Sequence, residues 1–176
     1  IDIHSHVNFS AFDADREATV KRALDAGVAI INVGTQQDTS KVAVEMTEKY
    51  ENGVFSIIGL HPIHTGKSFH DEKELGAGNT EFTSRGEVFD NSYYRELVRH
   101  PKVVGIGECG LDYYRHDTNT TNGGTKDTNK IQETMFRQQI ELAIEVGKPL
   151  MLHMRNGSGR SAYRDAFSIL KSYVIH

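Results

Sequence analysis

Six short apolar runs, rich in β-branched residues, alternate with longer stretches of helical periodicity, and this alternation most narrowly limits the fold. We expect the runs to be strands of a parallel sheet, because strands covered by helices on both faces read as continuous apolar segments. The expected strands cover residues 1–4, 28–34, 54–60, 103–107, 150–153 and 173–176.

Helices are expected in the stretches between these strands. Aspartate and serine side chains near the start of the first two can accept the free backbone N–H groups of a first helical turn. The expected helices run from Asp13 or Asp15 to Ala26, from a cap within 38–40, over 130–146 and over 161–172. Between them, the polar stretches 65–90 and 116–129 are predicted to be inserted surface loops.

This order of elements predicts an α/β domain with five β-α units followed by a sixth strand, all within residues 1–176. A TIM-type (β/α)8 barrel usually needs about 250 residues. The chain would then cover about two thirds of the barrel, and we expect the domain to be incomplete at its C-terminal end. An open doubly wound sheet of six strands is the alternative, because it fits this length as it stands.

The charge balance is weakly acidic, with 20 Lys and Arg against 24 Asp and Glu, for a net charge of −4. Because neutralising many phosphates needs a basic surface, this balance disfavours electrostatic wrapping of nucleic acid but leaves room for a local phosphate site. Cys109 is the only cysteine, which excludes an internal disulfide, and no run of eighteen apolar residues occurs. We therefore expect no membrane span and a cytoplasmic location.

Histidines and one carboxylate lie at the C-terminal ends of five of the six expected strands. Parallel α/β folds build their sites at that edge of the sheet, so these side chains are expected to meet. They are His4 and His6, His61, Glu108, His153 and His176.

The first two histidines form a candidate metal-binding pair. Alternate residues of a strand share a face, so His4 and His6 can reach the same ion, and imidazole suits zinc and similar divalent metals. Asp2 would face the same side and could orient one of the rings. Histidines of a surface loop are the alternative interpretation.

Glu108 follows a buried strand, where an unpaired carboxylate is costly. We expect it to share a metal with the histidines, and its two oxygens could bridge two ions; a salt bridge is the alternative. His153 is either a further ligand or a hydrogen-bonded core histidine. Arg155 indicates an anion, because guanidinium matches phosphate with two parallel hydrogen bonds, unless it forms a surface salt bridge. His61 could contact phosphate or a metal.

Five motifs occur together in this chain: DIHSH at 2–6, GLHP at 59–62, GECGLDY at 107–113, FRQQ at 136–139 with Ala143, and KPLMLHMR at 148–155. In this order and approximate spacing they resemble the TatD family of metal-dependent deoxyribonucleases. The resemblance covers the chain from its first residue to about Arg155, apart from the two polar stretches. It implies a distorted TIM barrel of the amidohydrolase superfamily.

The resemblance also implies two divalent ions, Mg, Mn or Zn, and a role for each candidate residue. In the family pattern the positions of His4 and His6 hold one ion, and that of Glu108 bridges both. The position of His153 holds the second ion together with a histidine of the sixth strand, matched by His176. The catalytic set implied for this chain is Glu108 with His61 and Arg155, the last two associated with the substrate phosphate.

The implied activity is hydrolysis of phosphodiester bonds in DNA, by exonuclease action from the 3′ end of single strands. The family carries a late aspartate as general base, and this chain has no match for it, so we expect these 176 residues alone to hydrolyse DNA poorly. One alternative is another amidohydrolase acting on an amide or lactone, although such enzymes often bridge their metals with a carboxylated lysine where Glu108 stands. A catalytically degenerate metal-binding fragment is the other.

Overall fold

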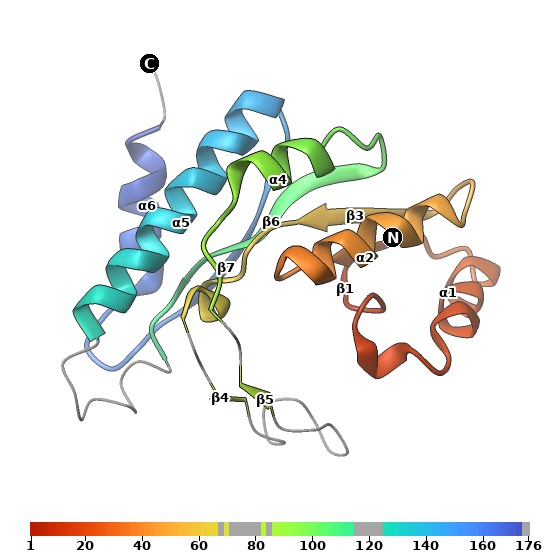
Figure 1. Cartoon of the computed structure of the whole chain (residues 1–176), viewed down its shortest axis with the longest axis horizontal. Helices are drawn as coiled ribbons and strands as arrows, with labels where there is room; N and C mark the ends of the chain where they lie inside the picture. The colour runs from red at the N-terminus through yellow and green to blue at the C-terminus, as the bar shows by residue number, and fades with distance from the viewer. Residues whose placement is uncertain (67–68, 71–81, 84–85, 115–124, 174–176) are drawn as a thin grey trace.

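The computed structural model describes residues 1–66, 69–70, 82–83, 86–114 and 125–173 (Figure 1). Strands and helices alternate along the described chain, with two short 3-10 helices after β1 and β3. In chain order the elements are β1 (Asp2–Ser5), η1 (Ser10–Phe12), α1 (Arg16–Asp25), β2 (Ile30–Val33), α2 (Gln37–Glu48), β3 (Val54–Ile58), η2 (Pro62–Thr65), β4 (Phe69–His70), β5 (Phe82–Thr83), α4 (Asn91–Leu97), β6 (Val103–Asp112), α5 (Thr125–Val146), β7 (Leu150–Arg155) and α6 (Ala162–Lys171).

The main sheet has five strands in the order β1-β2-β3-β6-β7, and every neighbouring pair is parallel. This spatial order follows the chain order without a reversal. A doubly wound sheet reverses its strand order at a switch point, so the doubly wound alternative is wrong. The sheet is a curled half-barrel of TIM type, as the β-α repeat predicted. β4 and β5 pair separately and antiparallel.

Helices α2, α4 and α5 lie side by side over one face of this sheet, as Figure 1 shows, with α1 and α6 at opposite ends of the molecule. The largest core cluster lies between these three helices and the sheet. It includes Ile58, Leu60 and Ile106 from the sheet side and Tyr94 and Met135 from the helices. Burial of these side chains holds α2, α4 and α5 against the sheet and so fixes the positions of the strand ends.

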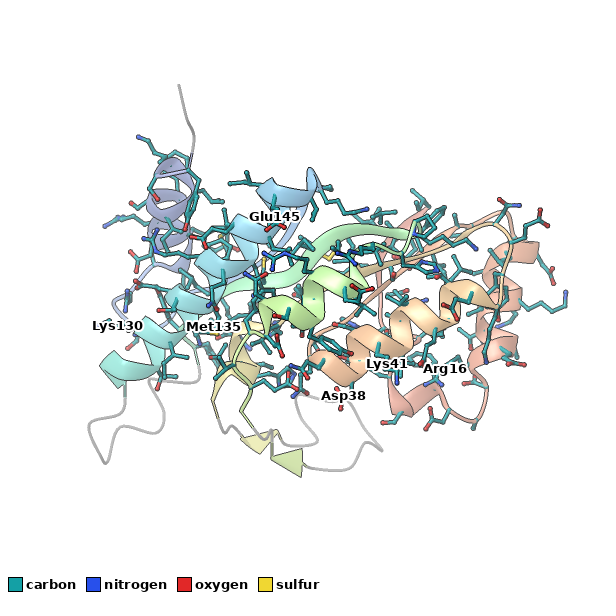
Figure 2. The ribbon with its side chains drawn as sticks, turned by 45° about the horizontal axis from the view of Figure 1, so that its top comes forward. Arg16, Asp38, Lys41, Lys130, Met135 and Glu145 are labelled. Carbon is teal, nitrogen blue, oxygen red and sulfur yellow. The ribbon has the colours of Figure 1, made fainter. Side chains whose placement is uncertain are left out.

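An exposed ion pair links α4 and α5 on the outer side of this helical layer. Figure 2 shows Lys130 and Glu145 toward opposite ends of α5, with Met135 between them. Glu145 accepts two hydrogen bonds from the Arg95 guanidinium of α4, at 2.8 and 2.7 Å.

No helix among the described residues is both long enough and apolar enough to cross a bilayer.

The two edge strands of the half-barrel carry exposed apolar side chains. Ile1 and Ile3 at the β1 edge are 73% and 60% exposed, and Leu152 in β7 is 40% exposed. The expectation that every strand is buried on both faces is therefore wrong for β1. As an edge strand it pairs only with β2 within the described sheet, so much of its surface meets solvent.

The predicted helix starts are partly corrected. The first helix begins at Arg16 after Asp15, as expected. The second begins at Gln37 with Gln36 as its N-cap residue, so an N-cap within 38–40 is wrong, although Thr39 takes part in the capping box. The Thr39 hydroxyl accepts the backbone N–H groups of Thr35 and Gln36, each at 2.9 Å, and thereby satisfies the amides that precede the helix.

The two polar stretches are not simply loops. The second one, 116–129, overlaps α5, which begins at Thr125, and the first contains the β4–β5 pair. Helix α4 directly follows the first stretch and was not predicted; the Asp90 carboxylate caps it by accepting the N–H of Tyr93 at 3.1 Å. Of the expected sixth strand, residues 174–176 lie outside the described residues, so that prediction and the candidate ligand His176 stay open.

Candidate metal centre

Four segments of the half-barrel bring ionisable side chains to the same place. His4 lies in β1 and His6 just after it, while His61 follows β3. Glu108 lies in β6 and His153 in β7. Because the strands are parallel, their C-terminal halves meet at one edge, and the four histidines gather around the carboxylate of Glu108.

These five residues form two groups, each with one ligand atom per residue and all three atoms within 4.8 Å of one another. In the first, His4 Nε2 lies 3.2 Å from Glu108 Oε2 and 3.2 Å from His6 Nε2. In the second, Glu108 Oε1 lies 3.0 Å from His153 Nδ1 and 3.7 Å from His61 Nε2. The two oxygens of one carboxylate therefore face two different histidine pairs.

This arrangement fits two divalent metal ions by donor type as well as by spacing. Neutral imidazole and carboxylate are the ligands of zinc and of related first-row metals, and a carboxylate between two such sites can donate one oxygen to each. We name the groups the first triad (His4, His6, Glu108) and the second triad (His61, Glu108, His153). The second differs from the implied ligand set, because His61 occupies a place beside Glu108 and His153.

His6 is oriented by backbone and not by Asp2. Its Nδ1 lies 3.0 Å from the carbonyl oxygen of Val33 in β2, which leaves Nε2 facing the first triad. The carboxylate of Asp2 instead accepts the backbone N–H of His4 at 3.0 Å. The sequence expectation that Asp2 orients a histidine ring is thus replaced by a main-chain contact to His4 and a carbonyl partner for His6.

Asp112 is a member of the site that the sequence analysis missed. Its Oδ2 lies 2.9 Å from His153 Nε2, while its Oδ1 accepts the N–H of Tyr114 at 3.0 Å, and its side chain is 2% exposed. The predicted strand ended at residue 107, but β6 continues to Asp112. Glu108 and Asp112 are then four residues apart on one strand face, which is the spacing that could have revealed the pair.

The two carboxylates determine the charge of His153. Burial lowers the pKa of His153, but its hydrogen bonds to Asp112 and Glu108 and their negative charge outweigh burial and raise the pKa to about 9. Burial raises the pKa of Glu108, whereas the hydrogen bond from His153 and the charges of His153 and His4 bring it below the ordinary value. A protonated His153 therefore supplies the positive charge between two carboxylates.

We expect divalent metal binding near neutral pH to release a proton from His153. The imidazole must be neutral to act as a ligand, and its raised pKa means that it is charged at pH 7. The apparent affinity for Mn²⁺ should rise by up to about tenfold per pH unit until pH 9. The folding stability of the metal-free protein depends on pH in the opposite direction. The stabilisation from charged His153 is complete below pH 6.5 and is lost as the pH rises through about 9.

Calorimetric titration with Mn²⁺ at pH 7, in buffers that differ in ionisation enthalpy, counts the released protons. Asp112→Asn should reduce that number, because the lost negative charge lowers the pKa of His153. Release that is absent in the unmodified protein, or unaltered by Asp112→Asn, contradicts the pairing.

Two buried glutamines of α5 hold the strand ends from behind. The side chain of Gln139 accepts the N–H of Leu60 at 2.9 Å and donates to its carbonyl at 3.0 Å. Gln132 makes the same pair of bonds to Asp112, at 2.9 and 3.0 Å. Since Leu60 directly precedes His61, one helix positions backbone on both sides of the second triad.

Arg155 lies outside both triads. Its guanidinium carbon is 3.8 Å from the ring centroid of Tyr114, and both side chains are exposed. Among the described residues its partner is an aromatic face and not a carboxylate, and its phosphate role stays a prediction. A guanidinium stacked in this way keeps its N–H edge available for an anion.

A cleft of about 410 Å³ opens beside the two triads. His6, His61 and Glu108 contribute to its wall, and Phe9, Thr35 and Ile63 are among the residues on its other sides. His64 is buried and also lines this cleft. The candidate metal centre is therefore accessible from a pocket of small-molecule size.

Comparison with known proteins gives a consistent result. The sequence model of the family described as TatD related DNase matches residues 1–176. An uncharacterized metal-dependent hydrolase, YabD of Bacillus subtilis, is 33% identical over 171 residues, covering 97% of this chain and 54% of the relative. The 3′-5′ ssDNA/RNA exonuclease TatD of Cronobacter sakazakii is 32% identical over 160 residues, covering 90% and 50%.

Among solved structures, an uncharacterized amidohydrolase from Saccharomyces cerevisiae superimposes with a TM-score of 0.56 at 21% identity, over 92% of this chain and 45% of that one. This similarity supports the barrel-type fold. The chain spans about half the length of the curated relatives it matches.

Proposed function

The chain belongs to the family of TatD-related DNases, and from that premise we propose that it forms the metal-binding part of a hydrolase that cleaves phosphodiester bonds of DNA. The observation that carries the proposal is the position of Glu108, whose two oxygens face two separate histidine pairs. Relatives named as 3′-5′ ssDNA/RNA exonucleases support a more specific form: removal of nucleotides from the 3′ end of single strands.

We assign the metal ligands to the first and second triads, with two divalent ions, Mg, Mn or Zn. When bound, such ions polarise phosphoryl oxygens and lower the pKa of coordinated water. Glu108 supplies the negative charge that both positions share, and Asp112 holds the His153 ring by its second nitrogen. Such a carboxylate fixes the orientation of the ring and keeps it basic toward a metal.

His61, the member of the second triad that the resemblance associates with phosphate, and Arg155, outside both triads, would face the substrate. His61 is 6% exposed and adjoins Glu108, so a substrate group that reaches it must enter through the cleft. Arg155 is exposed beside Tyr114 and can approach a phosphate of the following nucleotide with both nitrogens of its planar edge. These contacts favour binding of one strand end, in keeping with the weakly acidic net charge.

The proposed function is tested with the protein at its natural length and single-stranded oligodeoxynucleotides labelled at the 5′ end, in Mn²⁺ or Mg²⁺. We expect a ladder that shortens from the 3′ end, stops with EDTA and disappears in Glu108→Gln. Products that lack this ladder, while elemental analysis shows bound metal, contradict the nuclease proposal. Hydrolysis of amide or lactone substrates by the same preparation would favour the other amidohydrolase chemistry.

We expect Arg155→Ala to reduce turnover of oligodeoxynucleotides by about tenfold to a hundredfold, since a hydrogen bond to a charged group contributes roughly 1.5–3 kcal/mol. Metal content should not change, because Arg155 lies outside both triads. Arg155→Lys should restore only part of the rate, because ammonium cannot reproduce the guanidinium fork or its stacking on Tyr114. Arg164→Ala, an exposed arginine of α6, is the matched control. Equal rates in Arg155→Ala and Arg164→Ala contradict the phosphate role.

A further inference from the structure

The cleft beside the triads has two chemically different sides. One side contains His6, His61 and Glu108, which belong to the candidate metal centre. The remaining described lining residues carry no carboxylate, ammonium or guanidinium group, and include the apolar side chains of Phe9 and Ile63. Thr35 adds a hydroxyl. A ligand that places a phosphate at the metal centre would therefore extend an uncharged part into the cleft.

Phe9 provides a fixed aromatic surface at this place. Its ring stacks on that of His6, with centroids 4.4 Å apart and planes inclined by 25°. His6 is itself held by the carbonyl oxygen of Val33 at 3.0 Å, and the backbone of Phe9 is tied to η1 by the N–H of Phe12, which donates to its carbonyl at 3.0 Å. The ring that lines the cleft is thus anchored to the first triad at one side.

The cleft volume limits the size of the ligand. Small-molecule pockets measure about 300–1,000 Å³, and a cleft of about 410 Å³ lies near the lower end of that range. It suits one nucleoside-sized group and not a length of strand. An uncharged planar group of that size, attached to a phosphate, matches a single nucleobase.

We propose that this cleft binds the base of the nucleotide whose phosphate lies at the metal centre, with the base stacked on Phe9. The proposal rests on the proposed nuclease function and adds to it a base subsite on the side of η1 and α2. Base stacking on an aromatic ring accepts every base, because each has a π-face. The subsite therefore recognises the presence of a base and not its identity.

The test compares two probes that differ only in the base, namely 2′-deoxyadenosine 5′-monophosphate and 2-deoxyribose 5-phosphate. Binding to the natural-length protein is measured by calorimetry in Mn²⁺. We expect Phe9→Ala to weaken the nucleotide by about tenfold, the effect of losing one base stack, and to leave the sugar phosphate unchanged. Phe9→Tyr should retain nucleotide affinity. Phe9→Leu keeps apolar volume without an aromatic plane, and should behave like Phe9→Ala.

Phe167→Ala is the matched control, because Phe167 is an exposed phenylalanine of α6 with no part in the cleft. Metal content measured in each variant checks that His6 still holds its place. The proposal is overturned when Phe9→Ala binds the nucleotide as well as Phe167→Ala does, or weakens both probes equally.

The binding data, taken together with the oligonucleotide cleavage assay, separate this proposal from the proposed function. Phe9-dependent nucleotide binding in a protein that cleaves no oligonucleotide would contradict the nuclease function and support the base subsite. Cleavage of oligodeoxynucleotides with nucleotide binding that ignores Phe9 would support the function and overturn the subsite.

Discussion

Replacing Glu108 by alanine is expected to abolish metal binding at both triads and to lower the hydrolysis rate by about a thousandfold or more. The physical reason is that one carboxylate faces both histidine pairs, at 3.2 Å from His4 and 3.0 Å from His153. Its removal leaves two histidine side chains and no carboxylate in each triad. Two divalent cations held at the adjacent triads would repel each other, and this variant would lack the negative charge that offsets the repulsion.

Elemental analysis of the purified, natural-length protein measures this effect directly. Glu108→Ala should lose both ions, whereas His153→Ala should lose one, because His153 belongs to the second triad alone. Glu145→Ala removes an exposed carboxylate that pairs with Arg95 and should retain full metal content and activity. Two ions retained in Glu108→Ala would contradict the bridging role.

Replacing Gly110 by alanine should lower the free energy of unfolding by about 3 kcal/mol or more, with loss of the site. Gly110 has φ 141°, a backbone conformation that is rare for L-residues with a side chain. An added Cβ would fall on the carbonyl oxygen of His153. Both backbones belong to the β6–β7 pair, in which Gly110 is opposite His153. The clash must therefore push apart the two strands that carry Glu108 and His153.

Gly27→Ala is the control for the backbone part of this effect. Gly27 also has a positive φ, of 73°, but a Cβ there would meet no atom within 4 Å. Its cost should be limited to about 1–2 kcal/mol. Urea unfolding followed by circular dichroism gives both values, and a Gly110→Ala loss no greater than that of Gly27→Ala would argue against the steric clash.

The gathering of site residues was the most predictable part of the molecule. Polarity placed directly after apolar runs identified His4, His61 and His153, and parallel pairing brought them together as expected. The predicted helix over 161–172 corresponds closely to α6. These features depend on local periodicity and on the strand direction that a β-α repeat imposes.

The missed features depend on contacts between distant residues. Glycines at 107 and 110 are poor strand formers and suggested that the fourth strand had ended, yet they lie within β6 because the β7 backbone approaches closely there. The pairing of Asp112 with His153 depends on the longer strand, so a strand predicted to end at residue 107 did not reveal it. The exposure of Ile3 could not be read from its apolar neighbours, since edge position is a property of the sheet.

The spacing of the two α5 glutamines has a mechanical consequence. Seven residues advance a helix by about 10.5 Å in nearly two full turns, so the side chains of Gln132 and Gln139 project from the same side of α5. Each engages the main chain of a different strand end, at Asp112 and Leu60. Both strand ends are therefore fastened to one helix, and the seven-residue spacing of the two glutamines sets how far apart α5 holds Leu60 and Asp112.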